Sequence, residues 1–165
     1  MIGRKGKNIS EANGFCFEKE GERKFLIFRI SKEEYGLDLS YIREVVKVKE
    51  VRPIPHTPEW MEGVTDLRGH LIALLSLRRR LNLKESDEPD RKMIVCQIQR
   101  RTFGLLVEEL GEILSLPQEK ILPVPEVLSK PSGRELVSEI AQIGGRMIPL
   151  LNPERMLASS EDRSI

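Results

Sequence analysis

The stretch KFLIFRISKEEYGLDLSYIREVVKVKE at residues 24–50 aligns without a gap with KMIVCQIQRRTFGLLVEELGEILSLPQ at residues 92–118, at an offset of 68 positions. Apolar residues in the first copy meet apolar residues in the second at almost every position, which is the signature of an internal repeat. The identical pairs are Lys24/Lys92, Ile30/Ile98, Gly36/Gly104, Leu37/Leu105 and Glu44/Glu112. The apolar match breaks at two pairs, Asp38/Leu106 and Tyr41/Glu109.

The two halves also end alike. Residues 69–76, GHLIALLS, match residues 145–152, GRMIPLLN, at an offset of 76, and PIP at 53–55 matches PVP at 123–125. Two halves of about 65 to 75 residues are each too small to be comfortably stable alone. The repeat therefore indicates two small units that share one body, and a chance match between generic strand patterns is the alternative.

Within each half the periodicity is that of strands. Residues 25–30 form a short apolar and aromatic run, and alternation resumes at residues 35–39 after a polar turn, which predicts a hairpin. Residues 45–48 predict a third strand, and residues 64–75 predict a second hairpin with Gly69 in its turn. Because five short strands close most easily into a small barrel, we predict a mainly β fold of two five-stranded SH3-like barrels.

Each half is expected to end in a short helix. Ser76 and Asn152 occupy the same repeat position and are good N-cap residues, and Pro153 stands where a first helical residue would.

The length of 165 residues fits one ordinary domain. Residues 1–23, rich in Gly, Lys, Glu and Ser, lack the strand patterning and predict a flexible tail. The expected organisation is a tail at 1–23, one domain at 24–157 with halves at 24–83 and 91–157, and a second tail at 158–165.

The composition of the chain restricts the classes of function that it can have. Lys and Arg number 27 against 26 Asp and Glu, so no overall charge favours nucleic acid or an anionic membrane. Cys16 and Cys96 match neither a disulfide framework nor a zinc site, and this fits the reducing cytoplasm. The longest apolar run, residues 71–75, is far shorter than the roughly 20 residues of a membrane helix.

Catalytic motifs are not evident. His56 and His70 stand in no recognisable nucleophile or metal motif, and His70 is expected to be a surface or rim residue. Glu108 and Glu109 point to opposite faces of a strand, which predicts a solvated pair rather than an acid/base dyad. We therefore predict a protein that is not an enzyme and uses no metal or cofactor. An enzyme that uses Glu108 or His56 is a residual alternative and needs a pocket.

Two basic clusters, residues 78–80 and 100–101, are what a nucleic-acid-binding protein would use. We interpret them as a solvated helix face and a hairpin tip, because acidic residues lie close by. Aromatic residues are only 5% of the chain, which leaves little for base stacking. A small β-barrel nucleic-acid-binding protein is the runner-up function, and its binding should fall steeply with salt.

The tetrapeptide DLRG at residues 66–69 contrasts with its repeat partner QIGG at 142–145, which has no charged residue. An arginine at a hairpin end offers a planar fork that can clamp a carboxylate of a partner or of its own protein. The alternative is an exposed turn arginine, Arg68, loosely paired with Asp66.

These residues resemble the CheW-like domain family over roughly residues 24–157. The likeness rests on EYGLDL at 34–39, IPHTP at 54–58, GVTDLRG at 63–69, LR at 77–78 and LPVPE at 122–126. The resemblance implies two intertwined β-barrels, in agreement with the repeat. It also implies a non-enzymatic adaptor that couples chemoreceptors to a CheA-type histidine kinase in a bacterial chemosensory array.

The resemblance also implies site residues. Ile42, Glu44, Gly63 and Arg68 match family residues associated with coupling and partner binding. Asp66 belongs to the same group, although the family usually has Asn there. We expect Glu44 and Arg68 to pair, which would keep the arginine fork aimed.

A loop with Leu122, Glu126 and Val127 resembles the kinase-contacting barrel end of the family, with Leu122 in place of a residue that is often basic. Its stiffening prolines suit a binding edge, and a structural turn is the alternative. The implied partners are the helical hairpin tip of a receptor and the regulatory domain of the kinase, with no nucleic acid and no membrane insertion. The implied location is the cytoplasm, with recruitment to the inner face of the membrane through receptor arrays.

Overall fold

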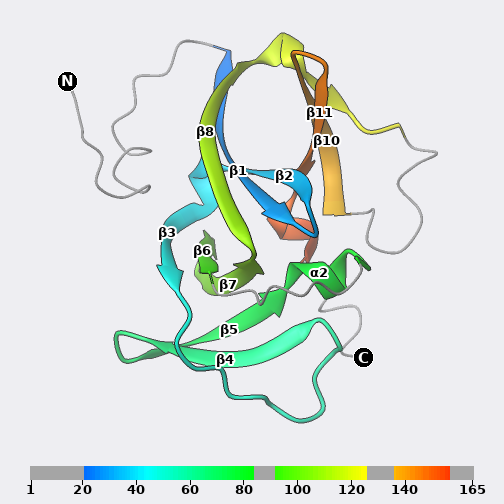
Figure 1. Ribbon diagram of the computed structural model, residues 1–165. Helices are drawn as coiled ribbons and strands as arrows, with labels where there is room; N and C mark the ends of the chain where they lie inside the picture. The colour runs from blue at the N-terminus through cyan, green and yellow to red at the C-terminus, as the bar shows by residue number, and fades with distance from the viewer. Residues whose placement is uncertain (1–20, 84–91, 126–135, 157–165) are drawn as a thin grey trace.

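The computed structural model describes residues 21–83, 92–125 and 136–156, which form two β-sheets (Figure 1). The strands are β1 (Glu22–Ile30), β2 (Glu33–Asp38), β3 (Ile42–Lys47), β4 (Met61–Leu67), β5 (His70–Ser76), β6 (Lys92–Ile98), β7 (Arg101–Val107), β8 (Glu109–Pro117), β9 (Ile121–Pro123), β10 (Val137–Ile143) and β11 (Arg146–Leu151). The short helices are η1 (Leu39–Tyr41), α2 (Leu77–Arg80), η2 (Gln118–Lys120) and one turn of α-helix at residues 153–156. The predicted mainly β fold is confirmed.

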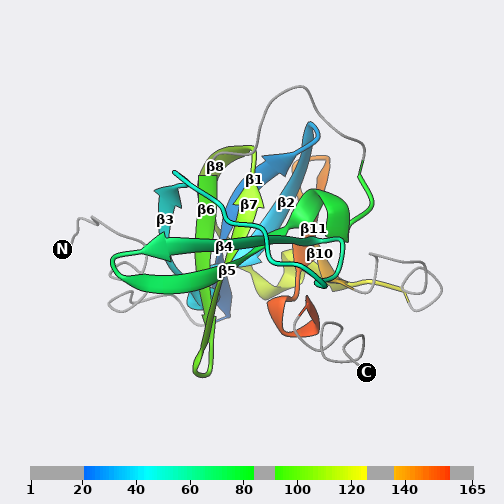
Figure 2. The ribbon, with the colours of Figure 1, turned by 90° about the horizontal axis from the view of Figure 1, so that it is seen from below.

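The two halves of the chain exchange their first hairpins. One sheet has the order β8-β1-β2-β11-β10-β9, and the other has the order β3-β6-β7-β5-β4. The β1–β2 hairpin therefore lies among strands of the second half, seen as blue beside orange in Figure 1. The β6–β7 hairpin lies among strands of the first half (Figure 2). The intertwining is confirmed, although the first sheet has six strands where five were predicted, because the chain after β8 forms the three-residue strand β9.

Two parallel strand pairs hold the exchanged hairpins. β11 pairs with β2 through Leu150 and Gly36, and β5 pairs with β7 through Leu74 and Gly104, two contacts that the repeat relates to each other. Both glycines stand where a side chain has no room. A Cβ at Gly36 would lie 2.6 Å from Leu150 Cδ2, and one at Gly104 would lie 2.3 Å from Met93 Sδ. This close packing explains why glycine recurs at this repeat position.

One continuous segment closes each sheet into a barrel. β8 pairs with β1 at one edge, and after η2 the chain continues into β9, which pairs with β10 at the other edge. In the second sheet β3 pairs with β6, and a bridge between Arg52 and Val64 takes the place of β9–β10 pairing. The repeat relates this bridge to the Leu122–Ile140 pair, so the closure is the same in both barrels.

Alternation along the strands separates three apolar clusters. On β1, Phe25 and Ile27 face the interior of the first barrel, whereas Leu26, Phe28 and Ile30 enter a central cluster between the barrels. β6 divides its apolar side chains in the same way between the second barrel and the central cluster. A strand segment buried on both faces is apolar at consecutive positions rather than alternating, as residues 25–28 and 93–96 are.

Both predicted short helices are present. Ser76 Oγ accepts a hydrogen bond from Arg79 N at 3.3 Å, and Asn152 Oδ1 accepts one from Glu154 N at 3.0 Å. The expected tail boundary is wrong by two residues, because residues 22–23 pair with β8 as part of β1. The remainder of the predicted tails, apart from Gly21, lies outside the described residues. No helix in the described part of the chain is long and apolar enough to cross a membrane.

A buried ion pair joins the two barrels. Arg78 on α2 donates to Glu108, between β7 and β8, and to Ser31 Oγ at 2.6 Å in the β1–β2 turn. The Arg78 and Glu108 side chains are only 6% and 10% exposed. Two expectations are therefore wrong: Glu108 is not solvated, and Arg78 and Arg80 do not lie on a solvated helix face. The sequence gives no sign of this burial because the charges meet only across the barrel junction.

Replacing Gly104 by Ala is expected to lower the free energy of unfolding by about 1–3 kcal/mol, because the new Cβ overlaps the Met93 side chain. Urea unfolding followed by the fluorescence of Trp60, the only tryptophan, measures the change. Met93→Ala clears the space, so the double variant should lose less than the sum of the two single variants. Additive losses would contradict this explanation of the glycine.

Replacing Arg78 by Leu is expected to cost about 3–5 kcal/mol of unfolding free energy, because it leaves the buried Glu108 carboxylate without its cation. The double variant Arg78→Leu, Glu108→Leu removes both charges and should recover much of that loss in the same unfolding assay. A double variant as unstable as Arg78→Leu would show that the unpaired charge is not the cause.

Candidate functional site

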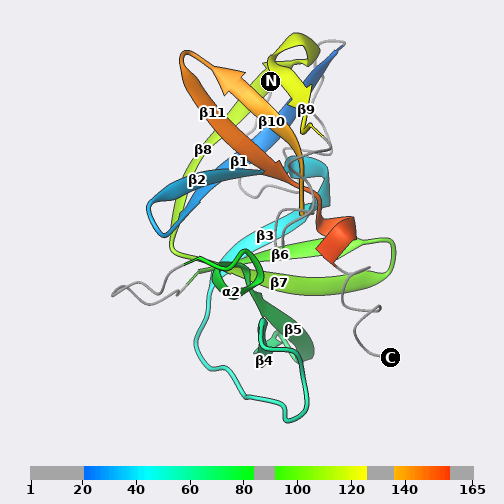
Figure 3. The ribbon, with the colours of Figure 1, turned by 90° about the vertical axis from the view of Figure 1, so that its right-hand side faces the viewer.

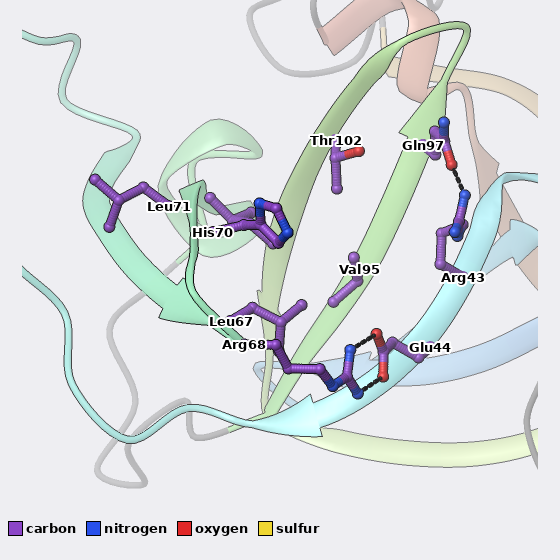
Figure 4. Close-up of a pocket in the computed structure, with 10 residues that line it drawn as sticks. Arg43, Glu44, Leu67, Arg68, His70, Leu71, Val95, Gln97 and Thr102 are labelled. Atoms are coloured by element: carbon purple, nitrogen blue, oxygen red, sulfur yellow. Dashed lines mark hydrogen bonds and ion pairs between the residues drawn. The ribbon is translucent and has the colours of Figure 1, made fainter.

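A groove of about 600 Å³ opens on the second barrel, between β3, the β4–β5 hairpin and the β6–β7 hairpin (Figure 4). Its walls combine apolar side chains of the strands with a polar rim. The polar residues of the rim include Arg43, Glu44, Arg68, His70 and Gln97. We call this feature the second-barrel groove.

The turn between β4 and β5 brings Arg68 to the rim. Arg68 and Gly69 have φ values of +52° and +87°, as a two-residue type I′ turn requires. The left-handed conformation costs a residue other than glycine about 1–2 kcal/mol. The predicted hairpin is confirmed. Its turn holds Arg68 in a strained backbone conformation at the edge of the groove.

Arg68 and Glu44 form a two-pronged ion pair (Figure 4). Arg68 Nη1 donates to Glu44 Oε2 at 2.7 Å, and Nη2 donates to Oε1 at 2.6 Å. The expected pairing is confirmed. Hydrogen bonds from the guanidinium lower the pKa of Glu44 below its usual value, and the carboxylate raises the pKa of Arg68. The Arg68 side chain is 67% exposed, so its outer N–H groups remain accessible to an acceptor on a partner.

Asp66 does not compete for Arg68. It lies exposed on β4, and its carboxylate has no hydrogen bond or ion pair among the described residues. The alternative of a turn arginine loosely paired with Asp66 is therefore wrong, because Glu44 on the neighbouring β3 holds the guanidinium.

Ile42 and Gly63 present no side chain to the groove. Ile42 is 2% exposed and packs in the central cluster between the barrels. Gly63 has a φ of +144°, and a Cβ there would lie 2.2 Å from Arg52 O, within the bridge that closes the second barrel. Both residues therefore serve the packing of the fold in this structure, and their role in partner binding stays a prediction.

Leu122 lies far from the groove. It is 41% exposed on β9, which Figure 3 shows at the opposite end of the molecule from β4 and β5. Glu126 and Val127 lie outside the described residues, so the kinase-contacting loop stays a prediction beyond residue 125.

Several groove residues were not identified from the sequence, among them Arg43, Leu71 and Gln97. Arg43 donates to Gln97 across the rim, and Leu71 is 73% exposed at the groove wall. Strand alternation was the available signal for Leu71, because it places this residue on the face opposite the buried Ile72. The side chain of His70 lies at the rim, as expected (Figure 4).

The residues of the enzyme alternative lie apart from the groove. His56 is exposed in the loop between β3 and β4, and Glu108 is held in the buried pair with Arg78. Within the described ranges no three His, Cys, Asp or Glu residues come together in a group that could hold a metal ion.

Residues 24–161 match the family model of the CheW-like domain. A probable chemotaxis protein CheW of Rhizobium etli is 33% identical over 88% of this chain and 94% of its own length. The chemotaxis protein CheW of Klebsiella aerogenes is 32% identical over 84% of each chain. The crystal structure of the scaffolding protein TtCheW from Thermoanaerobacter tengcongensis matches with a TM-score of 0.72 and 30% identity, covering 79% of this chain and 88% of that one.

The lowered pKa of Glu44 predicts a pH-dependent contribution to stability. A carboxylate whose pKa is lower in the folded state stabilises the fold above its unfolded pKa, and the stabilisation disappears as the pH falls through the folded pKa. We expect Glu44→Gln to be slightly less stable than the parent chain near neutral pH, with the difference shrinking below a pH of about 4.5. Urea unfolding over this pH range measures the difference in stability between the two chains. A difference that stays constant through the acidic range would contradict the lowered pKa.

Proposed function

Since the chain belongs to the CheW-like domain family, we propose that it is a non-enzymatic adaptor that couples chemoreceptors to a CheA-type histidine kinase in a bacterial chemosensory array. Its relatives are named chemotaxis proteins CheW, and the similar solved structure is named a scaffolding protein. The observation that carries the proposal is the Glu44–Arg68 pair at the second-barrel groove.

The chemistry of the second-barrel groove supports docking of another protein. Leu71 offers exposed apolar surface beside a charged rim, the combination found in protein interfaces. Glu44 holds the guanidinium of Arg68 in place, so the side chain loses little further freedom when a partner binds. The accessible N–H groups of Arg68 suit a partner carboxylate. In this proposal the groove contributes directly to receptor and kinase coupling.

The segment that begins at Leu122 on β9 is proposed as a kinase-contacting edge of the first barrel. Leu122 provides exposed apolar surface, and Pro123 and Pro125 restrict the backbone before docking. Surfaces at opposite ends of the molecule would let one chain hold two partners at once (Figure 3). The proposed location is the cytoplasm, at the inner face of the membrane that carries the receptors.

The structure weakens the nucleic-acid alternative. Arg78 and Arg80 are each 5% exposed, so two of the three arginines at residues 78–80 do not face solvent. A phosphate backbone could reach only Arg79 of this cluster, which leaves fewer cations for the electrostatic binding that this alternative requires.

Arg68→Glu is expected to weaken assembly with a receptor cytoplasmic fragment and a kinase regulatory domain by about 10-fold or more, because it repels Glu44 and presents the wrong charge to a partner carboxylate. Co-sedimentation of the three purified proteins from one genome measures assembly. Arg29→Glu is the matched control, because Arg29 is also exposed and paired, with Glu109 at 3.5 Å.

Both variants must keep the Trp60 fluorescence of the folded chain. Undiminished assembly with folded Arg68→Glu would contradict the proposed role of Arg68. Failure of the parent chain to bind either partner would contradict the coupling function itself.

A further inference from the structure

A second pocket lies in the first barrel, where the internal repeat is broken. It has a volume of about 370 Å³ and is formed by the start of β1, the end of β2, η1 and the adjoining ends of β9, β10 and β11. Asp38 and Tyr41, the two positions at which the apolar match fails, both line it. The counterpart of Asp38 in the second barrel is Leu106, which is 5% exposed and packed in the interior. The first barrel therefore has a polar pocket at the position where the second barrel has a buried apolar side chain.

A third departure from the repeat adds a carboxylate to this pocket. Glu139 on β10 corresponds to Gly63 on β4, and both follow a register shift at the same place in their hairpins. At Gly63 the carbonyl of Arg52 leaves no room for a side chain. At Glu139 the side chain lines the pocket instead. Two carboxylates, Asp38 and Glu139, thus stand at positions that are uncharged in the other barrel.

Arg23 lies between these carboxylates without using all their oxygens. Its Nε and Nη2 donate to Asp38 Oδ2 at 3.3 and 3.1 Å, and its Nη1 donates to Glu139 Oε2 at 3.1 Å. The guanidinium carbon lies 5.0 Å from the centroid of the Phe25 ring, which holds it against the barrel wall. Within the described residues Glu139 Oε1 accepts no hydrogen bond, so one acceptor of the pocket remains for a guest.

The charged side chains that line the pocket carry a net negative charge. One cation, Arg23, faces two carboxylates, which leaves a net charge of −1. The pKa of the Tyr41 hydroxyl is raised, first by burial and then by Glu154, Asp38 and Glu139, while Arg23 acts in the opposite direction. The surrounding carboxylates therefore outweigh the guanidinium at the Tyr41 ring, and a second cation would be stabilised there.

We propose that this pocket receives a lysine side chain of the protein that docks beside β9. An ammonium group is a compact point charge that can contact the single open oxygen of Glu139, whereas a second guanidinium fork would compete with Arg23. The apolar walls given by Pro123, Leu151 and the Tyr41 ring suit the methylene stem of lysine. The pocket adjoins the proposed kinase-contacting edge, so the identity of the partner, though not the chemistry of the pocket, rests on the proposed function.

Carbodiimide coupling tests the contact with the kinase. The reagent activates a carboxylate, a lysine Nζ within contact attacks the carbonyl carbon, and an isopeptide bond forms as the urea leaves. The full chain is coupled to the kinase regulatory domain, and the linked peptides are identified by mass spectrometry. The expected product joins Glu139 or Asp38 to a lysine of the kinase. A complex that forms without any such product would overturn the assignment of this guest.

Substitution measures what the contact contributes. Glu139→Gln keeps the shape of the side chain and is expected to weaken kinase binding about 10-fold while leaving receptor binding unchanged. Glu119→Gln, on the exposed η2, is the matched control and should bind as the parent chain does. Unchanged kinase binding by Glu139→Gln would overturn the proposal, and so would an equal loss in both variants, which would indicate a general charge effect.

A titration without any partner separates this inference from the proposed function. Backbone amide NMR spectra of the full chain are recorded with Nα-acetyl-lysine methylamide and with the norleucine analogue, which has a similar stem and no ammonium. The lysine compound alone should shift the amides of Ser138, Glu139 and Tyr41, and Glu139→Gln should reduce those shifts. If the kinase fails to bind but these shifts appear, the proposed function fails and the lysine pocket stands. If neither compound or both compounds shift these amides, the lysine pocket is overturned.

Discussion

The parallel pairing of β11 with β2 and of β5 with β7 is the constraint on which the rest of the structure depends. Each pairing inserts the first hairpin of one half between strands of the other half. Neither barrel is complete without strands from both halves of the chain. This agrees with the small size of each half, which is too small to be comfortably stable alone. The central apolar cluster packs between the barrels, and the buried Arg78–Glu108 ion pair connects them.

This arrangement lets two related barrels carry different surfaces. The strand register of the two barrels is nearly the same, but the exposed chemistry differs where the repeat is broken. The second barrel has Arg68 in its turn, against Gly144 in the first, and Arg68 extends to Glu44. The first barrel has the carboxylates Asp38 and Glu139 lining a pocket. The second barrel has the buried Leu106 and the tightly packed Gly63 at the corresponding positions. A shared core thus holds two unlike surfaces in a fixed relation, which is what an adaptor requires.

Much of the fold was predictable because it depends on local chemistry. Strand periodicity, turn glycine and N-cap residues lie within a few positions of each other, and they correctly indicated the hairpins and both short helices. The exchange of hairpins was implied only by the family resemblance, because pairing between Gly36 and Leu150 joins residues far apart in the sequence. The burial of Glu108 was missed for the same reason. In the site, the pairing of Glu44 with Arg68 was expected, but the burial of Ile42 in the central cluster depends on tertiary packing that its sequence neighbours do not reveal.

The most direct test of the account is whether one copy of the chain binds both partners at once. Sedimentation velocity with a fluorescently labelled chain, a saturating receptor fragment and increasing kinase regulatory domain distinguishes a ternary complex from exchange between two binary complexes. We expect a larger species that contains all three proteins, because the two proposed surfaces lie at opposite ends of the molecule. Displacement of the receptor fragment by the kinase domain would contradict it.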